Sequence, residues 1–259
     1  MNVLFVLGWI AVVILFFAVV VGIQIRRTEY TVVQFILDRI VFILLQFLWR
    51  TKTPAALPLA RNKGGVIIAN HRSSADPFFI HRAAKRRVRW MVAREYCERK
   101  VMGWFLEEFG AIPTRRGGID NASVREAVNM LQQGQWVGVL PEGRINMTDE
   151  FMLPVRAGAA LLARRAGVPI VPVYIEGAPF NGTPISPFLM PAQVTITVGE
   201  PISPDAFASD ELMILAAVKE IAKLAGQPDF QPQLAGKNWK PTEEEVALAV
   251  AKAKESNRT

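Results

Sequence analysis

The sequence predicts an α/β fold, with a mixed, mostly parallel sheet flanked by helices and an N-terminal membrane-anchoring helical segment. From residue 66 onward, short apolar runs alternate with amphipathic stretches of helical period. This alternation is typical of a sheet whose two faces are covered by helices. Near the N-terminus, 21 consecutive residues carry no charged or strongly polar side chain. A helix of that length reaches across a hydrocarbon core of roughly 30 Å.

The uncharged run extends from Val3 to Ile23 and is followed directly by Arg26 and Arg27. Because a cleaved signal peptide carries its charges before the apolar run, this order favours an uncleaved anchor with its basic side in the cytoplasm. A buried core helix is the alternative. Residues 31–50 are apolar but include four polar side chains within one arc of a helical wheel. We expect a second helix there, lying in the membrane interface or packed against the first.

The region after residue 65 supplies the alternating elements. In chain order they are strand 66–69, helix 76–85, strand 88–93, helix 97–109, strand 110–114, helix 121–133, strand 136–140, helix 158–166, strands 170–175 and 194–198, and helix 210–225. Pro77 suits the first turn of a helix, with Ser73 or Ser74 as candidate caps, and Gly134 and Gly167 each suit a helix end.

We expect three parts in the chain: a membrane anchor of residues 1–50, a globular domain of residues 51–235 and a helical tail of residues 236–259. The 259 residues, 51% of them hydrophobic, suffice for one sizeable α/β domain with an appendage. The tail begins with acidic residues and ends with basic ones, as the dipole of a helix favours.

Composition restricts the chemistry. The single cysteine, Cys97, excludes an internal disulfide framework and a cysteine-rich zinc site, and two histidines argue against a histidine-based metal site. The net charge of +7 arises in residues 61–170, which hold 18 basic and 10 acidic groups. This excess suits nucleic acid, anionic lipid or a phosphate-bearing substrate, or it is a solvated basic face. No nucleic-acid-binding motif is present, so we expect no nucleic-acid partner.

His71 and Asp76 are the first candidates for chemistry, because they follow a predicted strand and begin the next helix. Histidine titrates near neutral pH and can take a proton from a hydroxyl, and a carboxylate on its other ring nitrogen would orient it. The chain lacks the G-x-S-x-G turn that presents a nucleophilic serine. The nucleophile would then be a hydroxyl of the substrate. By themselves, the two residues are better explained as a satisfied surface histidine beside a capped helix.

Charged groups also follow other predicted strands. Arg115 and Arg116 lie in a glycine-flanked turn, and Glu142, Gly143 and Arg144 follow the strand at 136–140. Several predicted strand ends therefore present polar or charged groups, and α/β folds place functional groups at such ends.

Together these residues resemble the four sequence blocks of the glycerolipid acyltransferase family, in its lysophosphatidic acid acyltransferase (PlsC-type) group. The blocks are, in order, Asn70, His71 and Asp76; Gly110 and Arg116; Pro141, Glu142, Gly143 and Arg144; and Ile170, Val171, Pro172 and Val173. The resemblance covers about residues 65–201. Two departures stand out: the third block lacks its usual threonine, as in lysophosphatidylethanolamine-reacylating proteins, and Arg115 replaces a common aspartate.

The resemblance implies the fold of that family and direct acyl transfer from a thioester, acyl-CoA or acyl-carrier protein, to a glycerolipid hydroxyl. His71 and Asp76 would be catalytic. Arg116 and Arg144 would hold the acceptor phosphate, and Gly143 would let the backbone approach closely. Glu142 would bond the glycerol backbone or brace an arginine, with a purely structural pairing to Arg144 as the alternative. Asn70 and Pro172 complete the implied binding set. No metal or cofactor is required besides the thioester co-substrate.

The expected activity is acylation of the sn-2 hydroxyl of lysophosphatidic acid, giving phosphatidic acid for phospholipid synthesis. Alternatives are another lysophospholipid or an amino-acid lipid as acceptor, or a non-catalytic membrane-anchored lipid-binding protein. The expected partners are membrane lipids, a lysophospholipid, and acyl-CoA or the acidic carrier protein. The expected location is the bacterial cytoplasmic membrane, with the catalytic domain on the cytoplasmic side.

Overall fold

The computed structural model describes residues 5–9, 12, 15, 19, 21–23, 25, 30–54, 57–60, 62–115 and 121–236. Two compact units make up the chain, Met1–Phe42 and Ile43–Thr259. About a third of the predicted anchor, residues 1–50, and nearly all of the predicted tail lie outside the described residues. None of the helices in the described ranges combines the length and the apolar character needed to cross a membrane. The anchor is therefore not confirmed and stays a prediction.

Helix α2 (Val32–Ile43) begins with a reciprocal pair of cap hydrogen bonds. Thr31 Oγ1 accepts the Gln34 N–H at 3.2 Å, and Gln34 Oε1 accepts the Thr31 N–H at 3.3 Å. The Thr-x-x-Gln spacing thereby satisfies two N–H groups that a helix start leaves unpaired. A short π-helical turn, η1 (Leu44–Leu48), follows. A helix predicted within residues 31–50 is thus present, and its place at a membrane stays a prediction.

A six-stranded mixed sheet, mostly parallel as predicted, forms the second unit. Its strands are β1 (Gly65–Ala69), β2 (Val88–Ala93), β3 (Ile112–Thr114), β4 (Trp136–Val139), β5 (Ile170–Glu176) and β6 (Thr195–Val198). Their order across the sheet is β3-β2-β4-β1-β5-β6, and only β6 runs antiparallel to its neighbour. β1 lies inside the sheet and is buried along its whole length. An unbroken apolar strand is what burial on both faces requires.

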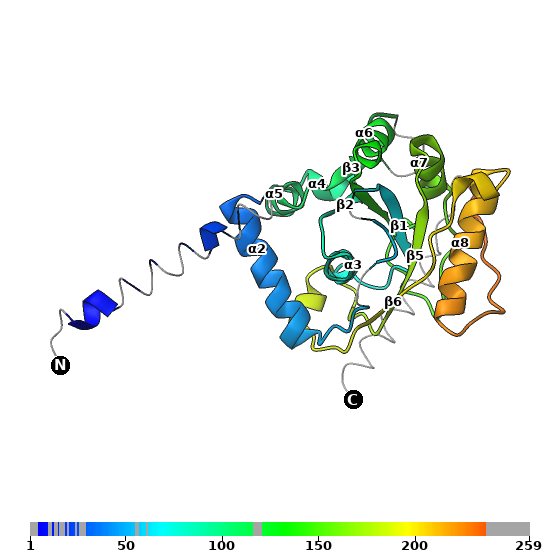
Figure 1. The fold of residues 1–259 in the computed structure, drawn as a ribbon. Coiled ribbons are helices and arrows are strands. Elements are labelled where there is room, and N and C mark those ends of the chain that lie inside the picture. The colour runs from blue at the N-terminus through cyan, green and yellow to red at the C-terminus, as the bar shows by residue number, and fades with distance from the viewer. Residues whose placement is uncertain are drawn as a thin grey trace. The chain divides into compact units, whose positions relative to one another are not determined.

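Helices cover both faces of this sheet (Figure 1). α6 (Asn121–Gln132), α7 (Gly158–Ala166) and α8 (Asp210–Leu224) pack side by side on one face, and α3 (Asp76–Ala84) packs on the other. The main apolar core lies between the sheet and the three helices, where side chains of β1 and β5 meet α7 and α8. Ser209 caps the start of α8, and its side chain accepts the Leu212 N–H at 3.2 Å.

Two details of the predicted elements are wrong. The single helix expected at 97–109 is two helices, α4 (Arg94–Cys97) and α5 (Lys100–Glu108), separated by an extended backbone at Arg99. The corner is tight, since a Cβ on Gly103 would lie 2.1 Å from the Cys97 carbonyl oxygen. The expected serine caps of α3 are also absent: its N-cap is Ala75, without a side-chain bond.

Candidate active site

His71 and Asp76 are hydrogen-bonded, with 2.9 Å between His71 Nδ1 and Asp76 Oδ2. Asp76, in the first turn of α3, is fully buried, whereas 15% of the His71 side chain is exposed. The same Oδ2 accepts the backbone N–H groups of Arg72 and Ser73, each at 2.9 Å. Three donors therefore fix this carboxylate oxygen. The predicted contact between the two side chains is confirmed, and their catalytic role stays a prediction.

Glu142 holds the backbone of His71 from the neighbouring strand. It is 3% exposed; Oε1 accepts the His71 N–H at 2.7 Å, and Oε2 accepts the Leu153 N–H at 2.8 Å. Burial raises the pKa of Glu142 to about 8, although the two backbone N–H groups act in the opposite direction. Because both oxygens bond the protein, Glu142 supports the His71 loop. Its predicted contact with substrate stays a prediction.

The segment after β4 is joined to the His71 loop along its length. Gly143 donates its N–H to the Leu140 carbonyl at 3.0 Å and adopts φ +70°, a left-handed conformation that favours glycine. Only a distant Arg156 atom, 3.9 Å away, would approach a Cβ there, so the backbone angle rather than crowding requires glycine. Asn146 then donates its N–H to the His71 carbonyl at 2.7 Å. Both backbone groups of His71 are thus bonded to this segment.

Arg72 is a structural residue that the sequence interpretation missed. Its guanidinium donates to the carbonyl oxygens of residues 146, 148, 150 and 151, including a 2.6 Å bond to Thr148. A planar guanidinium with five donors is suited to such a cluster of acceptors. In the sequence, the only indication of this structural role is that Arg72 directly follows His71. Arg72 thereby fixes the loop 146–151 against the catalytic candidates.

Asn70 and Pro172 both support the sheet. Asn70 is 2% exposed, and its side-chain amide bonds both backbone groups of Ile175, at 2.8 and 2.9 Å. The side chain therefore extends the pairing of β1 with β5 beyond the end of β1. Pro172 lies buried within β5, opposite Ile68 of β1, and does not line the cavity beside His71. Substrate contacts for these two residues stay predictions.

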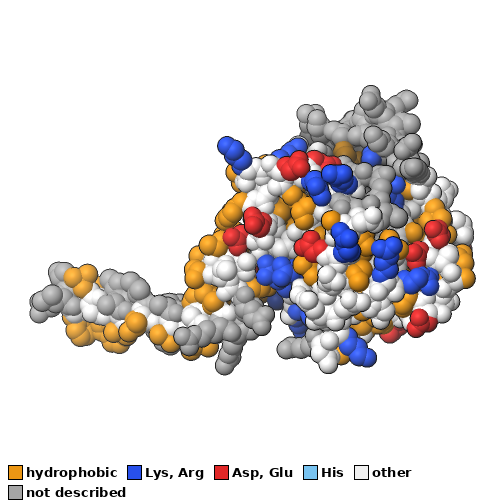
Figure 2. Space-filling view, turned by 90° about the horizontal axis from the view of Figure 1, so that it is seen from above, with side chains coloured by type: hydrophobic (Ala, Val, Ile, Leu, Met, Phe, Trp, Pro, Cys, Tyr) orange, Lys and Arg blue, Asp and Glu red, His pale blue; other side chains and the backbone are white. Residues whose placement is uncertain are grey.

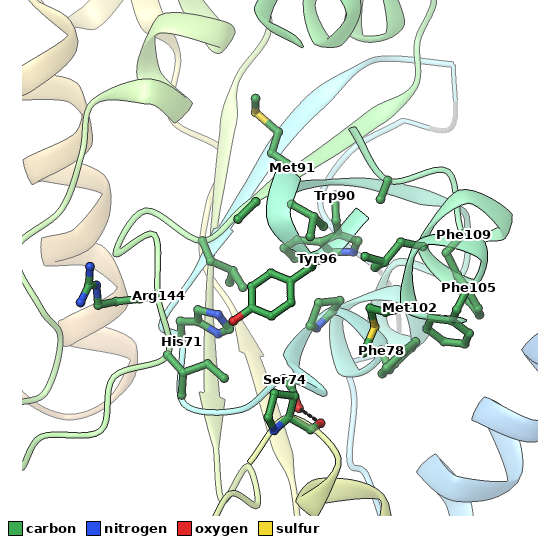
Figure 3. A pocket seen from close by; sticks show the side chains of 18 of the residues that line it. His71, Ser74, Phe78, Trp90, Met91, Tyr96, Met102, Phe105, Phe109 and Arg144 are labelled. Carbon is green, nitrogen blue, oxygen red and sulfur yellow. Dashed lines mark hydrogen bonds between the residues drawn. The ribbon is translucent and has the colours of Figure 1, made fainter. Parts of the chain in front are cut away.

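His71 lies in the wall of a cavity of about 930 Å³. Most of the remaining wall is apolar, contributed by β2, α3, α5 and the segments after β4 and β5. Figure 3 shows its aromatic part, in which the Phe105 and Phe109 rings lie 4.7 Å apart and Phe78 meets Phe105 at 5.9 Å. Cavities of this size and character hold apolar ligands, with a few polar groups to orient them. The histidine is one such polar group.

A second hollow, of about 560 Å³, lies on the other side of the loop 146–151. Met147 and Thr148 line both spaces, while Asn70, Arg72 and Tyr174 line only the second. Its wall is more polar, and Tyr174 has a pKa raised by burial and by Glu176. No group of three or more His, Cys, Asp or Glu side chains suited to a metal occurs in the described part of the chain.

The predicted phosphate-binding arginines are not gathered at His71. Arg144 lines the cavity, but Figure 3 shows its guanidinium directed away from His71. Arg115 is exposed at the end of β3, and Arg116 lies outside the described residues. On the face seen in Figure 2, Lys and Arg side chains are interspersed with acidic and apolar ones. The basic excess of the sequence therefore does not appear there as one continuous patch.

Comparison with known proteins places this geometry in a family. Residues 51–176 match the family model described as "Acyltransferase". The 1-acyl-sn-glycerol-3-phosphate acyltransferase of Bacillus subtilis (strain 168) is 26% identical over 159 residues, covering 58% of this chain and 72% of that protein. The N-acylphosphatidylethanolamine synthase of Arabidopsis thaliana is 30% identical, covering 62% of each chain. Several other curated relatives are matched over 41–50% of their length.

A solved structure shares the fold. The crystal structure of the 1-acyl-sn-glycerophosphate (LPA) acyltransferase, PlsC, from Thermotoga maritima superposes with a TM-score of 0.61 at 18% identity. The superposition covers 82% of this chain and 90% of that one. The four blocks, the domain match and the shared fold agree, and this chain belongs to the glycerolipid acyltransferase family that includes the PlsC-type 1-acyl-sn-glycerol-3-phosphate acyltransferases.

Proposed function

We propose that this acyltransferase moves a fatty acyl group from a thioester to the sn-2 hydroxyl of lysophosphatidic acid, giving phosphatidic acid for phospholipid synthesis. The observation that carries the proposal is the His71–Asp76 hydrogen bond of 2.9 Å, placed in the wall of a large apolar cavity. A histidine oriented by a carboxylate supplies a base, and the cavity supplies space for a lipid. A protein that only binds lipid has no need of the base.

In the proposed reaction, Nδ1–H of His71 donates to Asp76, which leaves Nε2 to take the proton of the acceptor hydroxyl. The alkoxide oxygen then attacks the thioester carbonyl directly. Asp76 stabilises the imidazolium that forms, and His71 returns the proton to the departing thiolate. No acyl-enzyme intermediate forms in this proposed reaction, because the nucleophile belongs to the acceptor.

The missing threonine between Gly143 and Arg144 favours another lysophospholipid as the second candidate acceptor, and the similarity to the Arabidopsis N-acylphosphatidylethanolamine synthase leaves the acceptor open. An amino-acid lipid is the further alternative inferred from the sequence. For either acceptor, the donor is acyl-CoA or an acidic acyl-carrier protein. The proposed location is the cytoplasmic side of a bacterial membrane, from which the enzyme would take its lipid.

The test uses the purified full-length protein, radiolabelled acyl-CoA and acyl-carrier protein, and a panel of lysolipids that differ in headgroup. Labelled phosphatidic acid as the main product, lost in a His71→Ala variant, supports the proposal. Faster acylation of a lysolipid without a free phosphate would replace lysophosphatidic acid with that acceptor. No product with any acceptor, from protein that folds and binds lysolipid, would favour the non-catalytic alternative.

A further inference from the structure

Tyr96 faces the catalytic candidates from the end of β2, which β4 separates from β1 in the sheet. It belongs to α4, which begins directly after β2, and it lines the same cavity as His71. Figure 3 shows its ring projecting into that cavity, with the hydroxyl pointing toward His71. The chain has three tyrosines, and neither of the other two lines this cavity. None of the four sequence blocks includes Tyr96, so the sequence interpretation did not identify it.

Arg99 supports the orientation of this ring. Its guanidinium carbon lies 5.4 Å from the centre of the Tyr96 ring, within the range of a cation–π contact. Arg99 occupies the extended corner between α4 and α5 and also lines the cavity. The corner that interrupts the predicted helix therefore places a cation over the Tyr96 ring while the hydroxyl end faces His71.

Two further hydroxyls line the cavity wall, and each donates to an oxygen atom of the protein. Ser74 Oγ donates to the Pro184 carbonyl at 2.6 Å, and Thr148 Oγ1 donates to Asn146 Oδ1 at 2.8 Å. Neither proton is directed at the histidine. A phenol hydrogen rotates about its C–O bond, so the Tyr96 hydroxyl can donate to an oxygen placed between its ring and His71.

We propose that Tyr96 is a catalytic residue that donates its O–H to the thioester carbonyl oxygen as negative charge develops there. The inference rests on the proposed acyl transfer. The acceptor proton passes to His71 Nε2, the acceptor oxygen forms a C–O bond to the carbonyl carbon, and the carbonyl π electrons move to the oxygen that Tyr96 holds. Those electrons then re-form the carbonyl, the C–S bond breaks, and the thiolate takes the proton from His71. The products are an ester and a free thiol.

Geometry favours this role for the hydroxyl. The acceptor hydroxyl must lie within hydrogen-bond reach of His71, and the carbonyl carbon it attacks lies about 3–3.5 Å further on. A donor on the cavity side of His71 thus faces the region where the carbonyl oxygen becomes negative. Donors fixed in advance at that position lower the barrier, because they need no reorganisation during the reaction.

The decisive variant is Tyr96→Phe, which removes only the hydroxyl. We expect kcat to fall about 100-fold, with both Michaelis constants nearly unchanged, because the donor acts in the transition state. The pH dependence of kcat/KM should keep its shape, since the base is still His71. Tyr174→Phe, which removes a hydroxyl from the second hollow, is the matched control and should retain wild-type kcat. Thermal unfolding of both variants shows whether they fold.

Arg99 provides an independent test of the proposal, as the residue that positions the Tyr96 ring. Arg99→Ala should lower kcat about two- to fivefold without raising either Michaelis constant, and Arg99→Lys should recover most of the loss. In Tyr96→Phe, the Arg99→Ala change should have no further effect on kcat, because the ring then has no hydroxyl to place. An additional loss of the same size in the double variant would contradict this role.

The outcomes separate the inference from the function on which it rests. A folded Tyr96→Phe enzyme with wild-type kcat overturns the inference and leaves acyl transfer intact. A shift in the pH profile overturns it too, because the hydroxyl would then act through His71. A wild-type protein that transfers no acyl group to any lysolipid overturns the proposed function, and the inference with it.

Discussion

The Glu142 carboxyl group accepts the backbone N–H of His71 at 2.7 Å, so a buried acid after β4 fixes the catalytic candidate after the neighbouring strand β1. The second oxygen accepts the Leu153 N–H at 2.8 Å, and this connects the His71 loop to the start of the segment that leads into α7. Burial removes water from the Glu142 carboxyl group, and this raises the free energy of its charged form. The residue that the sequence assigned to the substrate therefore has a clear supporting contact within the protein.

The first prediction concerns the pH dependence of stability. Burial raises the pKa of Glu142 from the ordinary 4.5 to about 8, so the folded state holds a proton that the unfolded state has lost between these values. The contribution of Glu142 to the free energy of unfolding is therefore complete below about pH 4.5 and is lost as the pH rises through 8. Glu142→Gln removes this titration.

Urea unfolding of the wild type and of Glu142→Gln at pH 5, 6.5 and 8 would test this. The stability advantage of the wild type over the variant should shrink as the pH rises. Glu176→Gln, at the exposed end of β5, is the control and should show no such trend relative to the wild type. An advantage that grows with pH would mean that Glu142 is charged in the folded protein.

Asp76→Asn should separate the charge of this residue from its geometry. An amide oxygen can replace Oδ2 toward the backbone N–H groups of Arg72 and Ser73, but its NH₂ would occupy the place of Oδ1, which is buried without a hydrogen-bond partner. We expect a loss of about 1–3 kcal/mol in the free energy of unfolding. We also expect kcat to fall by several orders of magnitude, because the imidazolium loses its counter-charge.

The readouts for Asp76→Asn are denaturant unfolding and steady-state acyl transfer, with His71→Ala assayed in parallel. His71→Ala should abolish transfer without unfolding the protein. More than a few per cent of wild-type activity in folded His71→Ala would exclude the histidine as the base. Asp76→Asn should be measurably less damaging than His71→Ala.

Arg72 should control the order of the loop 146–151. Its guanidinium donates to four carbonyl oxygens of that loop. A hydrogen bond to a charged group contributes at most about 1.5–3 kcal/mol to the free energy of unfolding. Arg72→Ala should therefore increase amide hydrogen exchange in this loop and lower activity. Arg72→Lys should recover only part of both, since lysine lacks the planar fork. Arg125→Ala, at an exposed position on α6, serves as the control and should leave exchange in the loop unchanged.

Arg116 tests the identity of the acceptor. If a phosphate monoester is bound there, Arg116→Ala should raise the Michaelis constant of lysophosphatidic acid by about 10- to 150-fold and leave that of the donor nearly unchanged. Arg116→Lys should rescue part of the loss. Arg144→Ala, whose guanidinium points away from His71, should have a smaller effect. A raised Michaelis constant for the donor instead would assign Arg116 to the phosphates of the thioester.

Hydrophobic periodicity predicts most of the fold. The strands at 66–69, 88–93 and 170–175 and the helices at 158–166 and 210–225 lie within about one residue of the observed elements. These are strongly apolar or amphipathic segments, for which burial and propensity agree. The prediction of one helix at 97–109 is wrong because the periodic pattern continues across the corner at Arg99. The extended backbone at Arg99 separates the two helices, and the close approach of Gly103 to the Cys97 carbonyl accompanies it.

Residue types at short, fixed spacings suffice to identify the family, the mostly parallel sheet and the His71–Asp76 pair. Which groups meet is decided by the tertiary structure. Contacts of Glu142 with His71, of Asn70 with Ile175 and of Arg72 with the loop 146–151 join residues far apart in the chain. The placement of Tyr96 with its hydroxyl toward His71 likewise depends on the order of β2, β4 and β1 in the sheet. Long-range pairing of strands fixes these distances, and no local pattern encodes them.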